Sequence, residues 1–227
     1  MVKNRFAAPD RSLARDSGKP GRDCPLCPRL VEFRRQCRAR EPLWHNAPVA
    51  SFGPRDARLL IVGLAPGLQG ANRTGRPFTG DFAGTLLYST LLKFGFAKGK
   101  FEERADDTLT LVGTRISNAV RCLPPENKPI PAEIATCRQF LISTIEEMKS
   151  LRAILVLGRV AHDSVVTALG VRKKDAPFGH GTKSPLGPLT LFDSYHCSRY
   201  NTNTGVLTEA MFHQVFKTLR AFLDGKP

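Results

Sequence analysis

Four segments along the chain have the pattern of β-strands. They are Leu59 to Gly63, Leu109 to Asn118, Ala153 to Leu157 and Leu189 to Asp193. Apolar residues at helical spacing follow Gly80 and continue from about Ala132 to Ser150, from Val160 to Leu169 and from Glu209 to Leu223. Strands that alternate with helices predict an α/β fold, a three-layer α/β/α sandwich around a central four-stranded parallel sheet.

The segments outside this pattern are polar. Residues 1–22 are basic and contain Gly and Pro, which predicts a flexible tail. A short basic helix is expected from Arg29 to Arg40, and residues 172–187 have the composition of a basic loop. No internal repeat or second apolar core is visible, so residues 23–227 are predicted to form a single domain.

The chain of 227 residues carries 34 Lys and Arg against 20 Asp and Glu, a formal net charge of +14. This excess favours a polyanion partner such as DNA, although a ribosomal or membrane-surface protein would have a similar balance. No apolar run reaches membrane-spanning length, and the N-terminal residues lack the apolar core of a secretory signal. We therefore expect a cytoplasmic protein, in which structural disulfides are rare, so the six cysteines need another role.

The loop that follows the first predicted strand is the strongest candidate for a functional site. It contains five glycines, at positions 63, 67, 70, 75 and 80, and glycines let a ligand approach the backbone closely. It lacks the glycine patterns of common phosphate sites. Pro66, Phe78 and Asp81 suit a flat base better than a phosphate. The simpler alternatives are a core role for Phe78 and an N-cap role for Asp81.

Polar side chains follow two of the other predicted strands. Asn118 ends the second strand, and its amide offers a hydrogen-bond donor and an acceptor together. His196 follows the fourth strand and precedes a mixture of polar, basic and aromatic residues, namely Ser198, Arg199, Tyr200, Asn201, Asn203 and Thr204. Such a mixture suits contacts with phosphates and a wedge into a duplex, whereas a solvated loop is the simpler interpretation.

Four of the cysteines form two pairs by spacing, Cys24-x2-Cys27 and Cys122-x14-Cys137. The first pair alone fits half of a zinc knuckle, a redox pair or part of a cluster ligand set. A two-knuckle zinc ribbon would need the short spacing twice, so the long second spacing fits a [4Fe–4S] cluster better. Cys37 and Cys197 have no partner by spacing and are expected to be packed or surface thiols.

Two long motifs stand out, GLAPGLQGANRTGRPFTGD from Gly63 to Asp81 and NAVRCLPP from Asn118 to Pro125. Together they resemble the family 5 uracil-DNA glycosylases, also called the UDGb type. The resemblance extends over about residues 20–223. It implies the fold of the uracil-DNA glycosylase superfamily and a [4Fe–4S] cluster, which would be bound by Cys24, Cys27, Cys122 and Cys137.

The resemblance also assigns roles to individual residues. The base pocket would consist of Gly63, Leu64, Ala65, Pro66, Gly67, Phe78, Asn118 and His196. Phe78 would stack on an extruded base, and Asp81, His196 and Asn118 would be catalytic. Contacts with double-stranded DNA, and with single-stranded DNA as well, would come from Arg73, Ser198, Arg199, Tyr200, Asn201, Asn203 and Thr204.

Two positions depart from related patterns. Leu64 stands where the family 4 enzymes have glutamate, so it cannot activate water. This is the family 5 condition, and it implies a permissive pocket that also accepts hypoxanthine and other deaminated bases. Cys197 stands where the usual His-Pro-Ser motif has proline, which leaves the loop around His196 less constrained.

The sequence therefore predicts a monomeric, monofunctional DNA glycosylase that hydrolyses the N-glycosidic bond of uracil and other deaminated bases, and so starts base excision repair. No lysine is placed as a Schiff-base nucleophile, so no lyase step is expected. One alternative is a non-catalytic nucleic-acid-binding protein with a zinc or iron–sulfur module. Another is a glycosylase relative that traps the abasic product covalently. That group has a basic insertion after the first motif, whereas Leu68 to Arg73 is short here.

Overall fold

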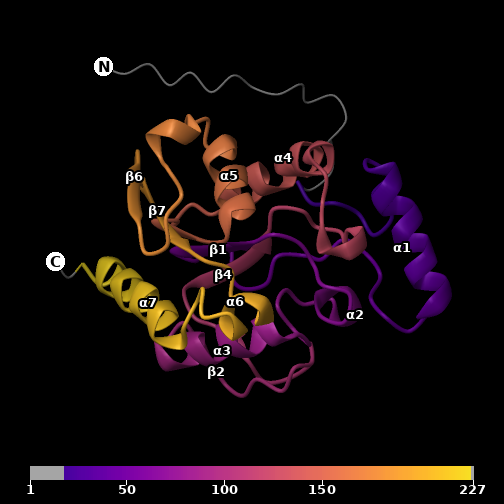
Figure 1. Cartoon of the computed structure of the whole chain (residues 1–227), viewed down its shortest axis with the longest axis horizontal. Coiled ribbons are helices and arrows are strands. Elements are labelled where there is room, and N and C mark those ends of the chain that lie inside the picture. Colours follow the sequence, from indigo (N-terminus) through magenta and orange to yellow (C-terminus); the bar gives the residue numbers. More distant parts are fainter. Residues whose placement is uncertain (1–17, 226–227) are drawn as a thin grey trace.

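The computed structural model describes residues 18–225, which form three layers (Figure 1). The central layer is a five-stranded sheet with the order β4-β1-β5-β7-β6. Its strands are β1 (Leu59–Gly63), β4 (Thr114–Asn118), β5 (Ala153–Leu157), β6 (Lys183–Leu186) and β7 (Leu189–Ser194). β4, β1, β5 and β7 are parallel, and β6 pairs antiparallel with β7. The predicted α/β/α architecture is confirmed, with a fifth strand at one edge.

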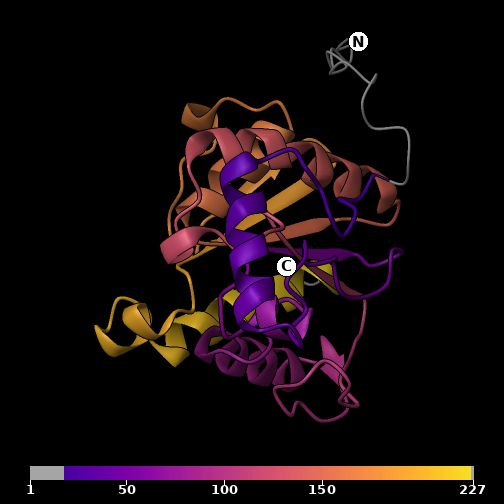
Figure 2. The ribbon, with the colours of Figure 1, turned by 90° about the vertical axis from the view of Figure 1, so that its right-hand side faces the viewer.

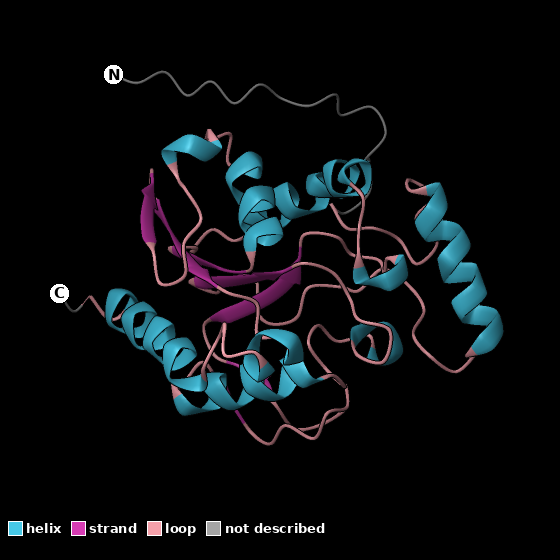
Figure 3. Ribbon diagram, in the orientation of Figure 1, coloured by secondary structure: helices cyan, strands magenta, loops and turns pink. Residues whose placement is uncertain are grey.

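Helices cover both faces of the sheet (Figures 1 and 3). α4 (Pro131–Glu147) and α5 (Arg159–Ala168) lie on one face, and α3 (Phe82–Lys93) and α7 (Glu209–Leu223) on the other. α1 (Pro28–Arg40) belongs to neither layer and runs across the front of Figure 2. The remaining helical segments are short: α2 (Ala71–Thr74), α6 (Arg199–Asn203) and the 3-10 turns η1 (Pro125–Asn127) and η2 (Lys173–Asp175). None of the helices within residues 18–225 is long and apolar enough to cross a membrane.

β1 and β5 have apolar side chains on both faces of the sheet, since successive side chains of a strand point to opposite sides and helices cover both. In β1, Leu59 and Ile61 pack in the core shared with α3 and α7, and Leu60 and Val62 pack in the core shared with α4 and α5. A parallel sheet covered on both faces favours such continuous apolar runs, and for this reason β1 and β5 are visible in the sequence.

The structure corrects two predicted segments. The predicted strand from Leu109 to Asn118 is broken where Gly113 adopts a left-handed φ of +56°. Its first part, β3 (Thr110–Leu111), pairs with β2 (Ala97–Lys98) in a separate two-stranded sheet. The predicted loop 172–187 contains the edge strand β6, whose Pro185 is tolerated at a sheet edge but hid the strand in the sequence. Most of the predicted tail, residues 1–17, lies outside the described residues.

Candidate functional site

A cavity of about 300 Å³ lies at the carboxyl ends of β1, β4 and β7, beside the first turn of α3. Parallel α/β sheets commonly bind ligands at this edge. It is lined by ten residues of the predicted site, namely Leu64, Ala65, Pro66, Gly67, Phe78, Asp81, Asn118, His196, Ser198 and Arg199. Four lining residues were not predicted, namely Ala71, Phe82, Ala83 and Asn127. Ala71 lies inside the first motif but has no polar or aromatic group that would mark it, and a helical pattern does not tell which side chain faces a cavity.

Phe78 forms one wall of this cavity. Its side chain is 6 % exposed, and its ring lies 6.1 Å from the imidazole of His196, centroid to centroid, at an angle of 29°. Gly63 makes room for the ring, because a Cβ there would stand 2.5 Å from Phe78 Cζ and 2.6 Å from Asn118 Oδ1. Gly63 does not line the cavity, but its missing side chain lets the ring and the amide pack against the strand end.

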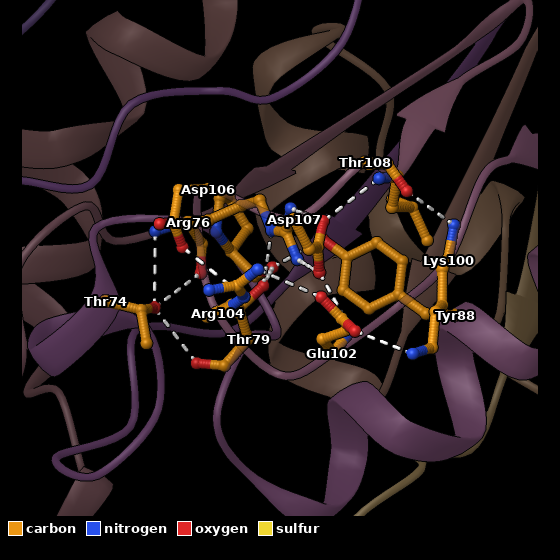
Figure 4. A network of polar contacts seen from close by, with 12 residues as sticks. Thr74, Arg76, Thr79, Tyr88, Lys100, Glu102, Arg104, Asp106, Asp107 and Thr108 are labelled. Atoms are coloured by element: carbon orange, nitrogen blue, oxygen red, sulfur yellow. Dashed lines mark hydrogen bonds and ion pairs between the residues drawn. The ribbon is translucent and has the colours of Figure 1, made fainter.

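The backbone of Phe78 has a left-handed φ of +53°, which a bulky residue keeps only when its surroundings hold it. Figure 4 shows these surroundings. Arg76 donates two hydrogen bonds of 2.7 Å to the carboxylate of Asp107 and one of 2.8 Å to Thr79 Oγ1. The Tyr88 hydroxyl donates to the carbonyl of the residue before Phe78 at 2.7 Å. The loop is therefore fixed on both sides of Phe78.

The Arg76–Asp107 pair is buried, with the two side chains 5 % and 0 % exposed. The guanidinium of Arg76 also lies 5.2 Å from the ring centre of Phe52 and 5.4 Å from that of Tyr88. The hydrogen bonds from Arg76 lower the pKa of the Asp107 carboxyl to about 2. Sequence reasoning missed this pair, because its members are 31 positions apart and belong to no motif.

Asn118 closes the inner end of the cavity. It is 3 % exposed, and its Oδ1 is a buried acceptor without a hydrogen-bond partner among the described residues. Buried polar atoms are nearly always paired, so an unpaired acceptor at a cavity indicates a ligand N–H. The Nδ2 atom of the same amide is a donor, so a base edge with an N–H beside a carbonyl oxygen would match it.

The two carboxylate oxygens of Asp81 have different surroundings. Oδ1 accepts a hydrogen bond from the Gly84 backbone N–H at 3.0 Å and caps α3. Oδ2 faces the glycine loop, where a Cβ on Gly67 would lie 3.2 Å away and a Cβ on Gly70 would overlap it. Burial raises the pKa of Asp81, and the bond from Gly84 opposes that shift. The helix cap and a second oxygen facing the loop therefore coexist in one side chain.

His196 is a neutral imidazole at physiological pH, because burial lowers its pKa to about 4. Its carbonyl accepts a hydrogen bond of 2.8 Å from Asn201 Nδ2. The next residue, Cys197, is fully buried, and its thiol donates to the Ala83 carbonyl at 3.5 Å. These contacts hold the backbone around His196 without the proline of the usual motif, so the expected loss of constraint is offset by packing.

The loop after His196 folds into α6, which the sequence did not predict. Ser198 caps this helix by accepting from the Asn201 backbone N–H at 3.3 Å. Arg199 lines the cavity, with its guanidinium 5.4 Å from the ring centre of Phe82. Tyr200 is 74 % exposed. Asn203 and Thr204 are also exposed, as is Arg73 on α2. Their contacts with DNA stay a prediction.

The cysteine pairs Cys24, Cys27 and Cys122, Cys137 line a second cavity between α1 and the start of α4. The Arg34 guanidinium lies 3.7 Å from Cys122 Sγ, and the Arg121 backbone N–H donates to Cys137 Sγ at 3.3 Å. Burial raises the pKa of the Cys122 thiol to about 12. Within the described part of the chain, no three or more His, Cys, Asp or Glu side chains form a group that could hold a metal ion.

The profile of the Uracil DNA glycosylase superfamily matches residues 50–220 of this chain. The chain belongs to this superfamily. It is 44 % identical over 199 residues to the type-5 uracil-DNA glycosylase of Thermus thermophilus, an alignment that covers 85 % of this chain and 90 % of the relative. The type-5 uracil-DNA glycosylases of Mycobacterium tuberculosis and Pyrobaculum aerophilum are 40 % and 34 % identical, over 86 % and 88 % of this chain and 76 % and 88 % of those relatives. The predicted family 5 membership is confirmed.

Proposed function

We propose that this protein is a monofunctional DNA glycosylase that hydrolyses the N-glycosidic bond of uracil in DNA and so starts base excision repair. One observation carries the proposal. The cavity has an aromatic wall, Phe78, and ends at Asn118, whose Oδ1 is buried without a partner in the described chain. The N3–H and O4 of uracil match the acceptor and donor of this amide. Names of relatives that share most of the chain support the same activity.

The geometry supports a dissociative mechanism. The base is extruded from the duplex, stacks on Phe78 and binds Asn118. The bond between C1′ and N1 breaks, and its electron pair leaves with the base. Neutral His196 stabilises the negative charge as a hydrogen-bond donor. Oδ2 of Asp81 faces the positive charge on the sugar, water adds to C1′, and the proton that this water releases balances the charge of the base.

Residues beyond the reacting groups support a broader substrate range and a DNA partner. Leu64 lines the cavity at the position where the family 4 enzymes have glutamate. Without that acid the pocket is more permissive, so hypoxanthine and other deaminated bases are proposed as further substrates. No lysine is among the described residues that line the cavity, which agrees with hydrolysis without a lyase step. Arg73, Arg199, Tyr200 and the polar residues of α6 are proposed to contact DNA, favoured by the net charge of +14.

A [4Fe–4S] cluster is proposed at the four cysteines that line the second cavity. Two observations fit this group: the thiols come from two distant segments, and N–H donors of Arg34 and Arg121 approach two of the sulfurs. When bound, the cluster would cross-link the segment that precedes α1 to the loop after β4 and to α4. We further propose that the protein acts as a monomer in the cytoplasm and that residues 23–227 form one domain.

A panel of duplexes tests the proposed activity. Each duplex contains uracil, hypoxanthine or xanthine at one position, opposite G or T, and abasic sites are scored after alkaline cleavage. Abasic sites on the uracil duplex, absent with His196→Ala, would support the proposal. Binding without cleavage would indicate the non-catalytic alternative, and a protein–DNA adduct that survives denaturation would indicate the covalent one.

A further inference from the structure

Asn127 lies at the cavity but has no role in the activity described above. It ends η1, in the loop that leads from Cys122 to α4, and its exposed side chain lines the cavity at its outer side. Within the described part of the chain, the side-chain amide of Asn127 makes no hydrogen bond. Its backbone N–H donates to the Pro124 carbonyl at 3.1 Å. A free donor and acceptor therefore stand at the opening of the base pocket.

The backbone at this position is in a conformation that few residues favour. Glu126 and Asn127 both have left-handed φ values, +54° and +57°. Asparagine adopts this region more readily than most other residues with a side chain, so the conformation of the turn favours an amide side chain at this position. Two consecutive left-handed residues persist only when neighbouring contacts hold them.

Those contacts come from α1. The Arg29 guanidinium donates to the Lys128 carbonyl at 3.0 Å, next to Asn127. It also forms two hydrogen bonds of 2.8 Å to the carboxylate of Glu133, which in turn accepts from the Ile130 backbone N–H at 2.9 Å. Glu133 is 4 % exposed. The turn is thus clamped on its C-terminal side, and Asn127 is held at the cavity before any DNA binds.

The two asparagines lie at different depths in the cavity, and this difference indicates different functions. Asn118 is 3 % exposed at the inner end of the cavity, whereas Asn127 is exposed at its opening. If the base occupies the inner end, as the proposed function requires, its sugar and phosphates remain at the opening. On that basis we infer that the Asn127 side-chain amide donates a hydrogen bond to a phosphate that flanks the extruded nucleotide. Asn127 is then a DNA-positioning residue of this glycosylase.

Two substitutions isolate the amide from the turn. Asn127→Gly removes the amide but keeps access to left-handed φ. Asn127→Asp keeps the size and the turn but replaces a donor with a negative charge. Single-turnover cleavage of a uracil duplex should need about tenfold more Asn127→Gly enzyme for half-maximal rate, as expected for a lost hydrogen bond to a charged group, and more again for Asn127→Asp. The maximal rate and the inhibition by free uracil should stay within about twofold.

A second series identifies the partner phosphate. Duplexes with one neutral methylphosphonate beside the uracil are compared for wild type and Asn127→Gly, and the difference between the two enzymes should disappear at one position. Gln139→Ala, an exposed amide on α4, is the matched control. The inference is overturned if Asn127→Gly binds like the control, if no methylphosphonate removes its defect, or if it weakens inhibition by free uracil. Wild-type enzyme that leaves uracil duplexes intact would instead refute the proposed function.

Discussion

Arg76 and Asp107 face each other through two hydrogen bonds of 2.7 Å inside the protein, and they fix the loop that presents Phe78. A buried ion pair adds little stability when compared with an apolar pair of similar shape. Its value here is geometric. The Arg76 guanidinium binds Asp107 with one edge and Thr79 with another, so the loop is restricted to a single conformation. The left-handed backbone of Phe78 needs that restraint.

Asp107→Asn should lower the free energy of unfolding by about 3–5 kcal/mol, because it leaves the buried charge of Arg76 without its partner. The pKa of Asp107 falls from an ordinary 3.8 to about 2 in the folded protein. The pair therefore contributes its full stability above about pH 4 and loses it as the pH falls from about 4 to 2. Urea unfolding across this range measures both effects.

Asp106→Asn is the matched control, because the Asp106 side chain is 79 % exposed and its ion pair with Arg104 spans 3.7 Å. An exposed pair of this kind contributes little, so this variant should unfold like wild type. Equal unfolding midpoints for the two variants would show that the Asp107 carboxylate does not hold the loop.

Local sequence signals predicted most of the residues that line the cavity, whereas contacts between distant segments were not predicted. The motif from Gly63 to Asp81 and the strand end at Asn118 gave most of the cavity, because a loop after a buried strand can lie only at the sheet edge. The Arg76–Asp107 pair and the position of Asn127 depend on contacts between distant segments. Such contacts follow from packing, which one sequence does not reveal.

Asp81→Asn should keep the fold and lose activity. The amide oxygen of Asn can still cap α3, so the unfolding midpoint should change little. The negative charge that faces the sugar cation is lost, which should reduce the single-turnover rate on uracil by about 10²–10³-fold. Affinity for DNA should persist. A rate within a few-fold of wild type, beside a crippled His196→Ala, would leave Asp81 as a helix cap alone.

His196 should give no inflection near pH 6.5 in the rate of base release. Burial lowers its pKa from 6.5 to about 4, so the imidazole is neutral throughout pH 5–8. The unfolded chain binds a proton below pH 6.5 that the folded protein does not, so this group lowers stability as the pH falls from 6.5 towards 4.

His196→Gln should remove the part of the pH dependence of the unfolding free energy that comes from His196. Urea unfolding at pH 7 and pH 5 measures this difference. His213→Gln on α7 serves as the control, because His213 lies outside the cavity. A rate inflection near pH 6.5 that persists in His213→Gln and vanishes in His196→Gln would contradict a buried neutral imidazole.

Each of the four cavity cysteines should be needed for a coloured protein. Cys24→Ser, Cys27→Ser, Cys122→Ser and Cys137→Ser should lose visible absorption and bound iron, because a [4Fe–4S] cluster uses four thiolates. Cys37→Ser and Cys197→Ser should keep both, since neither residue lines that cavity. Iron and zinc analysis of purified protein checks the assignment, and one zinc with no iron would replace the cluster with a zinc site.

Gly70→Ala should reproduce part of the Asp81→Asn defect while keeping the carboxylate group itself. A Cβ on Gly70 would overlap Asp81 Oδ2 and also approach its Cγ to 2.8 Å, so the carboxylate must move away from the glycine loop. The bond from Gly84 to Oδ1 lies on the capping side and can survive a small rotation.

The single-turnover rate should therefore fall by about tenfold or more, a fraction of the loss expected for one electrostatic group, at nearly unchanged affinity for DNA. Gly21→Ala is the control, because a Cβ there meets nothing within 4 Å. Thermal unfolding of both variants separates a shifted carboxylate from a lost cap, which would cost about 1 kcal/mol. If Gly70→Ala cleaves at the wild-type rate while Asp81→Asn does not, the oxygen that faces the glycine loop is not the one that opposes the sugar cation. The capping oxygen would then have to serve both the helix and the reaction.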